Sequence, residues 1–169
     1  MADVLTSEQR QRNMRNIHGK NTKPELLLRR ALHKCGLRYR LYGRDLPGCP
    51  DLVLPRYRTV IFVHGCFWHR HGCAATSTPA TRPEFWKKKF ADNVARDKKA
   101  VESLLANGWR VIIVWECALK DHARKELPVL CEQIVHTLRA EKHCAVCMQY
   151  PPSFTPAQRI SESDIIRDI

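Results

Sequence analysis

Residues 60–73 read VIFVHGCFWHRHGC, and this stretch joins an apolar run to a cluster of histidines and cysteines. The first four residues are apolar and mostly β-branched or aromatic, which predicts a strand buried on both faces. The next ten residues hold three histidines, two cysteines and the pair Phe67-Trp68. A surface loop has no structural need for this composition, so we expect a functional site directly after the strand.

Composition and charge favour one domain that binds a polyanion. A chain of 169 residues can bury a core without disulfides. Its 29 Lys+Arg against 17 Asp+Glu give a net charge of +12, which favours nucleic acid ahead of an acidic membrane surface. Apolar runs are too short to span a membrane and the N-terminus is not signal-like, so we expect a cytoplasmic protein. Eight reduced cysteines there favour zinc over disulfides.

Outward from residues 60–63, the sequence predicts the element order α-β-β-β-α-β-α. The segments Thr22–Glu25 and Thr81–Glu84 read as capping boxes that open two helices. The predicted helices are about 23–35, 81–106 and 122–141, and the predicted strands are about 38–42, 51–54, 60–63 and 109–115. The long helix should bury Trp86, Phe90, Val94, Val101, Leu104 and Leu105. This order predicts an α/β fold, a mixed central sheet flanked by helices.

Three residues of the cluster, Cys66, His71 and Cys73, have a spacing that suits metal binding. Cys117, just past the next buried strand, can supply a fourth ligand, and Cys3His is a closed tetrahedral zinc composition. The alternative is that these cysteines are small buried hydrophobic residues, and the spacing alone leaves both open. Cys144 and Cys147 form a weaker second pair, with Cys131 or His136 as further candidates.

Asp51 and the remaining histidines suggest a second site. Asp51 begins a strand whose hairpin partner ends at His64, and such a cleft can hold Mg²⁺. His64 and His69 can move protons near neutral pH. Glu25 could orient metal-bound water or act only as the capping partner of Thr22. Asp51 could equally be a turn residue after proline.

Further motifs extend the pattern along the chain. They are Asn13-Met-Arg, Leu46-Pro-Gly-x-Pro-Asp51, Pro79-Ala-Thr-Arg-x-Glu-Phe-Trp86, Asn93-Val-x-Arg-Asp97, Gly108-Trp-Arg-Val and Val114-Trp-Glu-Cys-Ala-Leu119. Together with HGCFWHRHGC they resemble the very short patch repair (Vsr-type) DNA mismatch endonucleases over about residues 7–140. The resemblance implies a restriction-endonuclease-like fold with a structural zinc. It also implies Mg²⁺-dependent hydrolysis of one strand, 5′ of the thymine in T·G mispairs left by deamination of 5-methylcytosine.

The resemblance also implies a role for each catalytic candidate. Asp51 binds Mg²⁺ directly, helped by the backbone carbonyl of Val63. His69 is the general base or water positioner, while His64 and Glu25 hold the hydrated metal. The superfamily usually has an acid and a lysine after the catalytic Asp, and here Phe62 and His64 stand in those places. The implied zinc ligands are Cys66, His71, Cys73 and Cys117.

The aromatic residues near the cluster have two readings. Phe67 and Trp68 could pack around the zinc, and Trp86 could belong to the core. Rigid aromatics beside a cleavage site can also wedge between base steps, at a cost that is lowest at a mispair. The resemblance implies this second role, with Met14 and Ile17 approaching from the minor groove.

We therefore expect a monomeric DNA mismatch endonuclease of the bacterial cytoplasm, associated with the nucleoid. Its substrate would be double-stranded DNA with a T·G mismatch. Its partners would be repair proteins such as a mismatch recognition factor and a DNA polymerase. The expected parts are a basic DNA-contacting arm (1–20), an endonuclease domain (21–142) and a poorly ordered C-terminal extension (143–169). Alternatives are a restriction-like nuclease on matched or methylated duplex and a non-catalytic zinc-stabilised DNA-binding module. The last would leave Asp51, His64 and His69 without a task.

Overall fold

The computed structural model describes most of the chain between residues 19 and 150. The described residues are Thr6, Glu8, Gln9, Arg12, Arg15, 19–120, 125–139 and 147–150. Met14 and Ile17, the expected minor-groove contacts, lie outside the described residues, as does Cys144 of the second cysteine pair.

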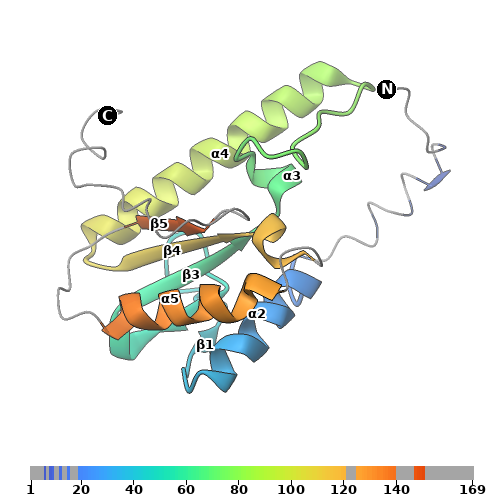
Figure 1. Cartoon of the computed structure of the whole chain (residues 1–169). Helices are drawn as coiled ribbons and strands as arrows, with labels where there is room; N and C mark the ends of the chain where they lie inside the picture. The colour runs from blue at the N-terminus through green and yellow to red at the C-terminus, as the bar shows by residue number, and fades with distance from the viewer. Residues whose placement is uncertain are drawn as a thin grey trace.

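A five-stranded mixed sheet forms the centre of the molecule, in the order β1-β2-β3-β4-β5 (Figure 1). Its strands are β1 (Arg40–Leu41), β2 (Leu52–Leu54), β3 (Thr59–His64), β4 (Arg110–Trp115) and β5 (Cys147–Tyr150). The first three strands pair antiparallel, whereas β3, β4 and β5 run parallel. The predicted mixed α/β sheet flanked by helices is confirmed.

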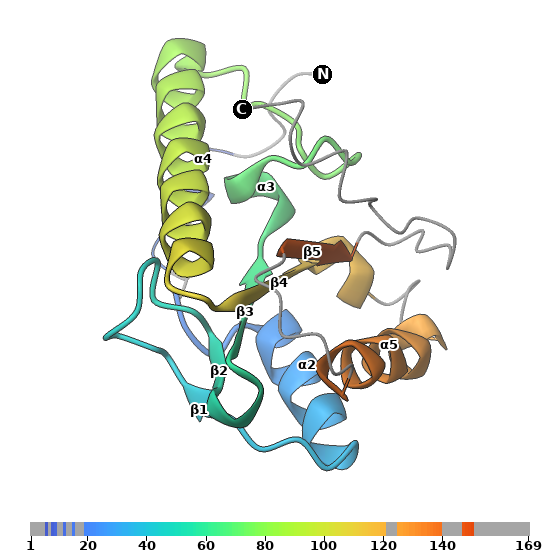
Figure 2. The ribbon, with the colours of Figure 1, turned by 90° about the vertical axis from the view of Figure 1, so that its left-hand side faces the viewer.

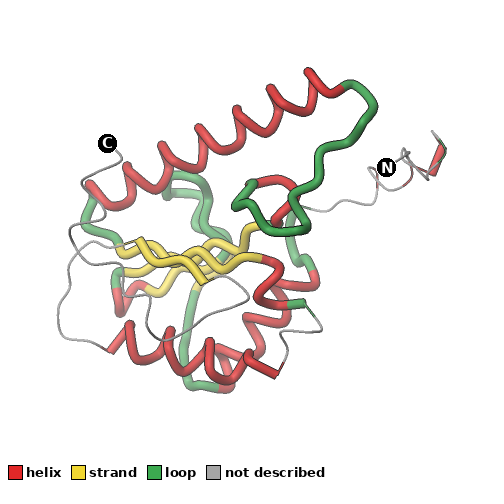
Figure 3. Tube along the Cα trace, turned by 45° about the horizontal axis from the view of Figure 1, so that its top comes forward, coloured by secondary structure: helices red, strands yellow, loops and turns green. Residues whose placement is uncertain are grey.

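Helices cover both faces of this sheet. In Figures 1 and 2, α2 (Lys23–Lys34) and α5 (Leu127–Arg139) lie on one side of the strands and α4 (Pro83–Ala106) on the other. A short helix, α3 (Cys66–His69), follows β3 directly. Figure 3 shows the loop that leaves α3 and runs to the far end of α4. The result is three layers, with the sheet in the middle.

The central strands are apolar between their ends, at 60–63 in β3 and 111–115 in β4, because each face packs against helices. In β3, Ile61 contributes to the core beneath α2 and α5, while its neighbours Val60 and Phe62 contribute to the core beneath α4. Side chains alternate between the faces of a strand, so a strand covered on both sides needs an unbroken apolar run. The strand predicted from residues 60–63 is confirmed.

Strand β5 is the largest departure from the sequence prediction. Residues 147–150 were expected in a poorly ordered extension, but they pair with β4, and Tyr150 is only 4% exposed. This part of the expectation is wrong because a four-residue strand owes its order to the parallel partner, which local sequence does not reveal. Cys147 packs in the core beneath α4 and Cys131 in the core on the opposite face, so these two thiols do not face a common site.

Helix α4 also differs from its prediction. The Thr81–Glu84 capping box does not form, since Arg82 is the N-cap in a left-handed conformation (φ 53°) and makes no side-chain cap. Proline at the first helical position sets the start instead. Only Phe90 and Leu104 of the expected stripe are fully buried, and Val94 is 42% exposed. Much of this helix therefore faces away from the core.

Candidate active site and metal-binding cluster

A cavity of about 830 Å³ lies where β2 begins and β3 ends, between α2 and α4. The antiparallel register pairs Leu52 with Ile61, which brings Asp51 beside the end of β3. The cavity wall includes Asp51, Glu25, Val63, His64, His69 and Trp68 from the predicted catalytic and wedge sets. Four separate elements thus bring the predicted catalytic residues into one place.

Asp51 lies on the cavity wall with its carboxylate partly buried. Its Oδ2 accepts a hydrogen bond of 2.7 Å from the backbone N–H of Val63. Burial raises the pKa of Asp51 to about 6; the Val63 bond opposes this shift, and the nearby Glu25 carboxylate adds to it. A carboxylate held in such surroundings favours a cation beside it.

The two histidines predicted to be catalytic stack on each other, and Asp97 contacts the second. The rings of His64 and His69 lie 4.0 Å apart and nearly parallel. His69 Nδ1 lies 2.5 Å from the Asp97 carboxylate, so a proton on Nδ1 leaves Nε2 free to accept another. Burial lowers the pKa of His64 to about 3, with His69 adding to the effect. His64 is therefore neutral at physiological pH.

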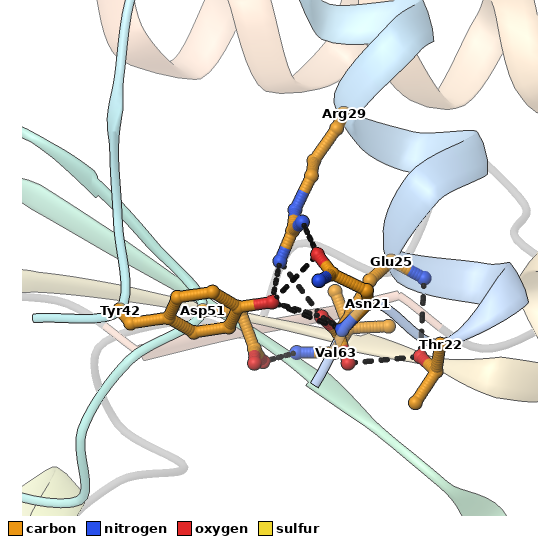
Figure 4. A network of polar contacts seen from close by, with 7 residues as sticks. All are labelled: Asn21, Thr22, Glu25, Arg29, Tyr42, Asp51 and Val63. Carbon is orange, nitrogen blue, oxygen red and sulfur yellow. Dashed lines mark hydrogen bonds and ion pairs between the residues drawn. The ribbon is translucent and has the colours of Figure 1, made fainter. Parts of the chain in front are cut away.

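Glu25 does more than cap its helix. Thr22 is the N-cap of α2, as predicted, and its hydroxyl accepts a bond from the Glu25 N–H. The Glu25 side chain is only 3% exposed and receives hydrogen bonds from the Asn21 N–H, the Thr22 hydroxyl and Arg29. Figure 4 shows this network beside Asp51. The helix start thereby holds a carboxylate at the cavity.

A second cluster brings together the four predicted zinc ligands. Cys66 begins α3, His71 and Cys73 follow it, and Cys117 lies in the short helix η2 (Glu116–Leu119) after β4. Their ligand atoms lie within 4.8 Å of one another, with His71 Nε2 3.2 Å from the sulfurs of Cys66 and Cys117. A tetrahedral zinc with Zn–S near 2.3 Å spaces its ligands by roughly 3.5–4 Å. The group can therefore hold a zinc ion.

The surroundings of this cluster keep it rigid. Burial raises the pKa of Cys66 and of Cys117. The contact between the two thiols lowers the pKa of Cys66 and raises that of Cys117. The Trp115 ring stacks on His71 at 4.1 Å and meets His64 edge-on at 5.3 Å. Trp115 therefore lies between the metal-binding cluster and the catalytic cavity.

The predicted wedge residues form one aromatic group under the start of α4. Phe67 packs edge-on against Trp68, Trp86 and the buried Phe90. Phe67, Trp68 and Trp86 remain partly exposed, and the neighbouring Phe85 is 57% exposed. Phe67, Trp68 and Trp86 thus pack within this aromatic group and remain partly exposed to solvent.

The residues that the sequence analysis left without a role include Asp97, Asn21, Arg29 and Tyr42. Asp97 could have been suspected because it lies four residues after Asn93, on the same side of a helix, and both line the cavity. Arg29 lies four residues after Glu25, the spacing of a helical ion pair, so it too could have been suspected. Asn21 lies four residues before Glu25, and Tyr42 carries no local signal because its contacts reach Arg29 and Asn21, 13 and 21 residues away.

Comparison with known proteins shows which family the chain belongs to. A family profile described as DNA mismatch endonuclease Vsr matches residues 2–75. The DNA mismatch endonuclease Vsr of Escherichia coli is 46% identical over 134 residues, covering 79% of this chain and 86% of the relative. The chain belongs to the Vsr family.

Other Vsr relatives carry names that describe nicking. The type II nicking enzyme V.XorIIP of Xanthomonas oryzae is 48% identical over 72% of this chain and 89% of its own length. V.NmeAIP of Neisseria meningitidis is 44% identical over 73% and 88%. This Vsr family member is accordingly an enzyme, an endonuclease that acts on DNA. Among the described residues, no helix combines the length and apolar character that a membrane span requires.

Proposed function

We propose that this enzyme nicks one DNA strand 5′ of the thymine in T·G mispairs and so initiates very short patch repair after deamination of 5-methylcytosine. The observation that carries the proposal is the meeting of Asp51, Glu25, His64 and His69 in one cavity. The printed name of the E. coli relative supports the mismatch as substrate, and the names of the nicking relatives support cleavage of a single strand.

The cavity fits a catalytic Mg²⁺. Two carboxylates in an open cavity offer the hard oxygen ligands and the space for water that this ion prefers. Asp51 would hold the ion directly with the Val63 carbonyl, and Glu25 and His64 would hold it through its waters. When bound, Mg²⁺ would offset charge on the scissile phosphate. The pKa of Asp51 is raised to about 6 because burial outweighs the Val63 bond and the nearby Arg29, and a bound cation would offset this effect.

His69 is the proposed proton acceptor. With Nδ1 held by Asp97, its Nε2 can take a proton from the attacking water. Asp97 then stabilises the imidazolium that forms, and it keeps the ring oriented. His64 stacks on this ring and, being neutral, adds no opposing charge.

We also propose a structural zinc at Cys66, His71, Cys73 and Cys117, and a DNA wedge made of Phe67, Trp68 and Trp86. The cluster geometry supports the zinc, which would staple the loop after α3 to the end of β4. Metal analysis of purified wild-type protein should give one zinc per chain, and Cys73→Ser should lose it together with stability. A zinc-free wild-type protein that folds and cuts normally would exclude this role.

The wedge can be tested separately from the zinc. Replacing Phe67, Trp68 and Trp86 together by Ala should leave the zinc content unchanged but strongly reduce nicking and T·G preference. Met14 and Ile17 remain proposed minor-groove contacts. An unchanged rate and preference in the folded triple variant would leave these aromatics with a packing role only.

A nicking assay tests the main proposal. Duplexes with a T·G pair, a matched T·A pair or a methylated C·G pair are incubated with Mg²⁺, and each strand is labelled separately. We expect cleavage of the thymine strand of the T·G duplex only, and loss of cleavage in Asp51→Ala with DNA binding retained. Equal cleavage of matched or methylated duplex would favour the restriction-like alternative, and binding without cleavage would favour the DNA-binding module.

The proposal extends to context. This activity accords with a restriction-endonuclease-like ancestry of the sheet, a monomeric state and a bacterial cytoplasmic location. It also accords with cooperation with repair proteins such as a mismatch recognition factor and a DNA polymerase. Gel filtration of the free enzyme would test the monomer.

A further inference from the structure

Tyr42 stands directly after β1 in an unusual backbone conformation. Its φ of 53° lies in the left-handed region, which a bulky residue rarely occupies. Its backbone N–H donates a 3.1 Å hydrogen bond to the carbonyl of Asp51. A strained residue that persists is held by its surroundings, and such residues concentrate at functional sites. The backbone of Tyr42 is thus joined to the residue that carries the catalytic carboxylate.

The hydroxyl of Tyr42 reaches the other carboxylate of the cavity through two neighbours, and it also lies 3.5 Å from Glu25 Oε2 itself. It accepts hydrogen bonds of 2.9 Å from Arg29 Nη2 and from the backbone N–H of Asn21. The same two donors bond Glu25 Oε2 at 2.7 and 3.0 Å. Arg29 Nη1 and the Tyr42 hydroxyl both donate to Asn21 Oδ1, at 2.7 and 2.9 Å. The four side chains form one closed network (Figure 4).

The ion pair at the centre of this network is buried. Arg29 is 5% exposed and Glu25 is 3% exposed, so their ion pair is shielded from solvent. Glu25 and Asp51 are two carboxylates on the wall of one cavity, and Arg29 is the cation paired with the first of them. Without that cation, Glu25 would be a buried charge with no counter-charge beside it.

We propose that Tyr42 and Arg29 are positioning residues that set the placement of Glu25 relative to Asp51 for the hydrated Mg²⁺. Tyr42 joins the two carboxylates, one through its backbone and the other through its hydroxyl, and Arg29 holds the orientation and charge of Glu25. The inference rests on the proposed function, because it assumes that both carboxylates serve the metal. It assigns a metal-tuning role to residues that contact neither metal nor DNA.

The test removes only the hydroxyl. Tyr42→Phe keeps the ring and the backbone but loses the bonds to Asn21 and Arg29. We expect the Mg²⁺ concentration for half-maximal nicking to rise by at least about 3- to 10-fold, because a single lost hydrogen bond has an effect of this size and three bonds of 2.9 Å are lost. The rate at saturating Mg²⁺ should change less than about twofold if transition-state contacts are intact. Calorimetric titration of Mg²⁺ into the enzyme on an uncleavable T·G duplex should show the same loss of affinity.

Tyr39→Phe is a matched control. The Tyr39 hydroxyl donates a 2.9 Å bond to the backbone carbonyl of Arg29, so the same atom is deleted beside the same residue without touching Glu25. Its Mg²⁺ dependence should equal that of the wild type. In Arg29→Gln the Mg²⁺ requirement should rise more than in Tyr42→Phe, and Arg29→Lys should partly restore it.

The outcomes separate the two levels of inference. If Tyr42→Phe has a wild-type Mg²⁺ affinity, or if Tyr39→Phe shows the same loss, the positioning role is wrong. A fall in unfolding temperature with an unchanged Mg²⁺ affinity would likewise make Tyr42 purely structural. If wild type and Asp51→Ala nick equally, the proposed function itself fails. Wild-type nicking that depends on Asp51 leaves only the role of Tyr42 and Arg29 to be decided.

Discussion

Asp51 carries its carboxylate in surroundings that favour the protonated form. Burial is the largest cause, and the nearby Glu25 adds to it, so the pKa rises to about 6. A carboxylate whose pKa is higher in the folded than in the unfolded state opposes folding once it ionises. The ionised Asp51 carboxylate therefore lowers the stability of the fold, and a bound cation can offset this effect.

Asp51→Asn should stabilise the protein at pH 7.5 without added Mg²⁺, by about 1–3 kcal/mol in the free energy of unfolding. The amide oxygen can still accept the Val63 bond. The gain in stability should vanish below about pH 4, where both Asp51 and the Asn that replaces it are neutral. It should grow between about pH 4 and 6 and stay constant above about pH 6. Denaturant unfolding across this range measures it. A variant less stable than wild type at pH 7.5 would show that the carboxylate is compensated locally.

His69 and Asp97 form the pair to which the proposed mechanism assigns the proton transfer. His69→Ala should lower the rate of nicking about 10²–10⁴-fold, the usual contribution of a general base. Asp97→Asn should lower it about 10- to 100-fold, since it removes the charge that stabilises the imidazolium and disturbs the orientation of the ring. Asp92→Asn, an exposed carboxylate on the same helix, should have no effect. Single-turnover rates at saturating Mg²⁺ decide this, and an unaffected Asp97→Asn would remove the pair from the mechanism.

Helix α4 shows how an element can serve the site rather than the core. Of its 24 residues only Phe90 and Leu104 are fully buried, while Asn93 and Asp97 line the cavity. Asn93 also donates a 3.2 Å bond to the carbonyl of Trp68. The helix packs against the core through Val101, Leu104 and Leu105, and it is polar at Asn93 and Asp97, where it forms one wall of the site.

Strand β5 should contribute substantially to stability. Tyr150 is buried in the core beneath α2 and α5, so Tyr150→Ala should lower the free energy of unfolding by about 3–5 kcal/mol. Gln149→Ala is the comparison, since it removes one 3.1 Å bond from the Trp115 indole and should lower it by about 0.5–1.5 kcal/mol. Denaturant titration of both variants measures the difference. If both variants lose equally little free energy of unfolding, residues 147–150 contribute little to the stability of the fold.

The whole molecule carries a net charge of +12, and lysines lie at the mouth of the cavity. A phosphate backbone docked there would release counterions, so affinity should fall steeply with salt. Lys89→Ala should reduce the slope of log affinity against log salt by about 1. Lys34→Ala, at the opposite end of α2 from the cavity, should leave the slope unchanged. Fluorescence anisotropy at several salt concentrations tests this, and equal slopes for all three proteins would place the DNA elsewhere.

Local sequence by itself determined the two central strands and the first helix. The apolar runs at 60–63 and 111–115 are strands because both of their faces are covered, and Thr22 begins α2 because its hydroxyl caps the helix. The motifs around HGCFWHRHGC were enough to indicate the family. Periodicity, caps and short motifs act within a few residues, so they can be read without knowing where the chain turns.

Only the tertiary structure decided which side chains meet. His69 and Asp97 are 28 residues apart, Asn21 and Tyr42 are 21 apart, and Cys117 lies 46 residues from His71. Such contacts depend on strand register and on how helices pack across the sheet. Strand β5 belongs with them, because four residues become a strand only when β4 supplies the partner for their hydrogen bonds. Long-range packing, which no local pattern encodes, therefore sets the geometry of the site.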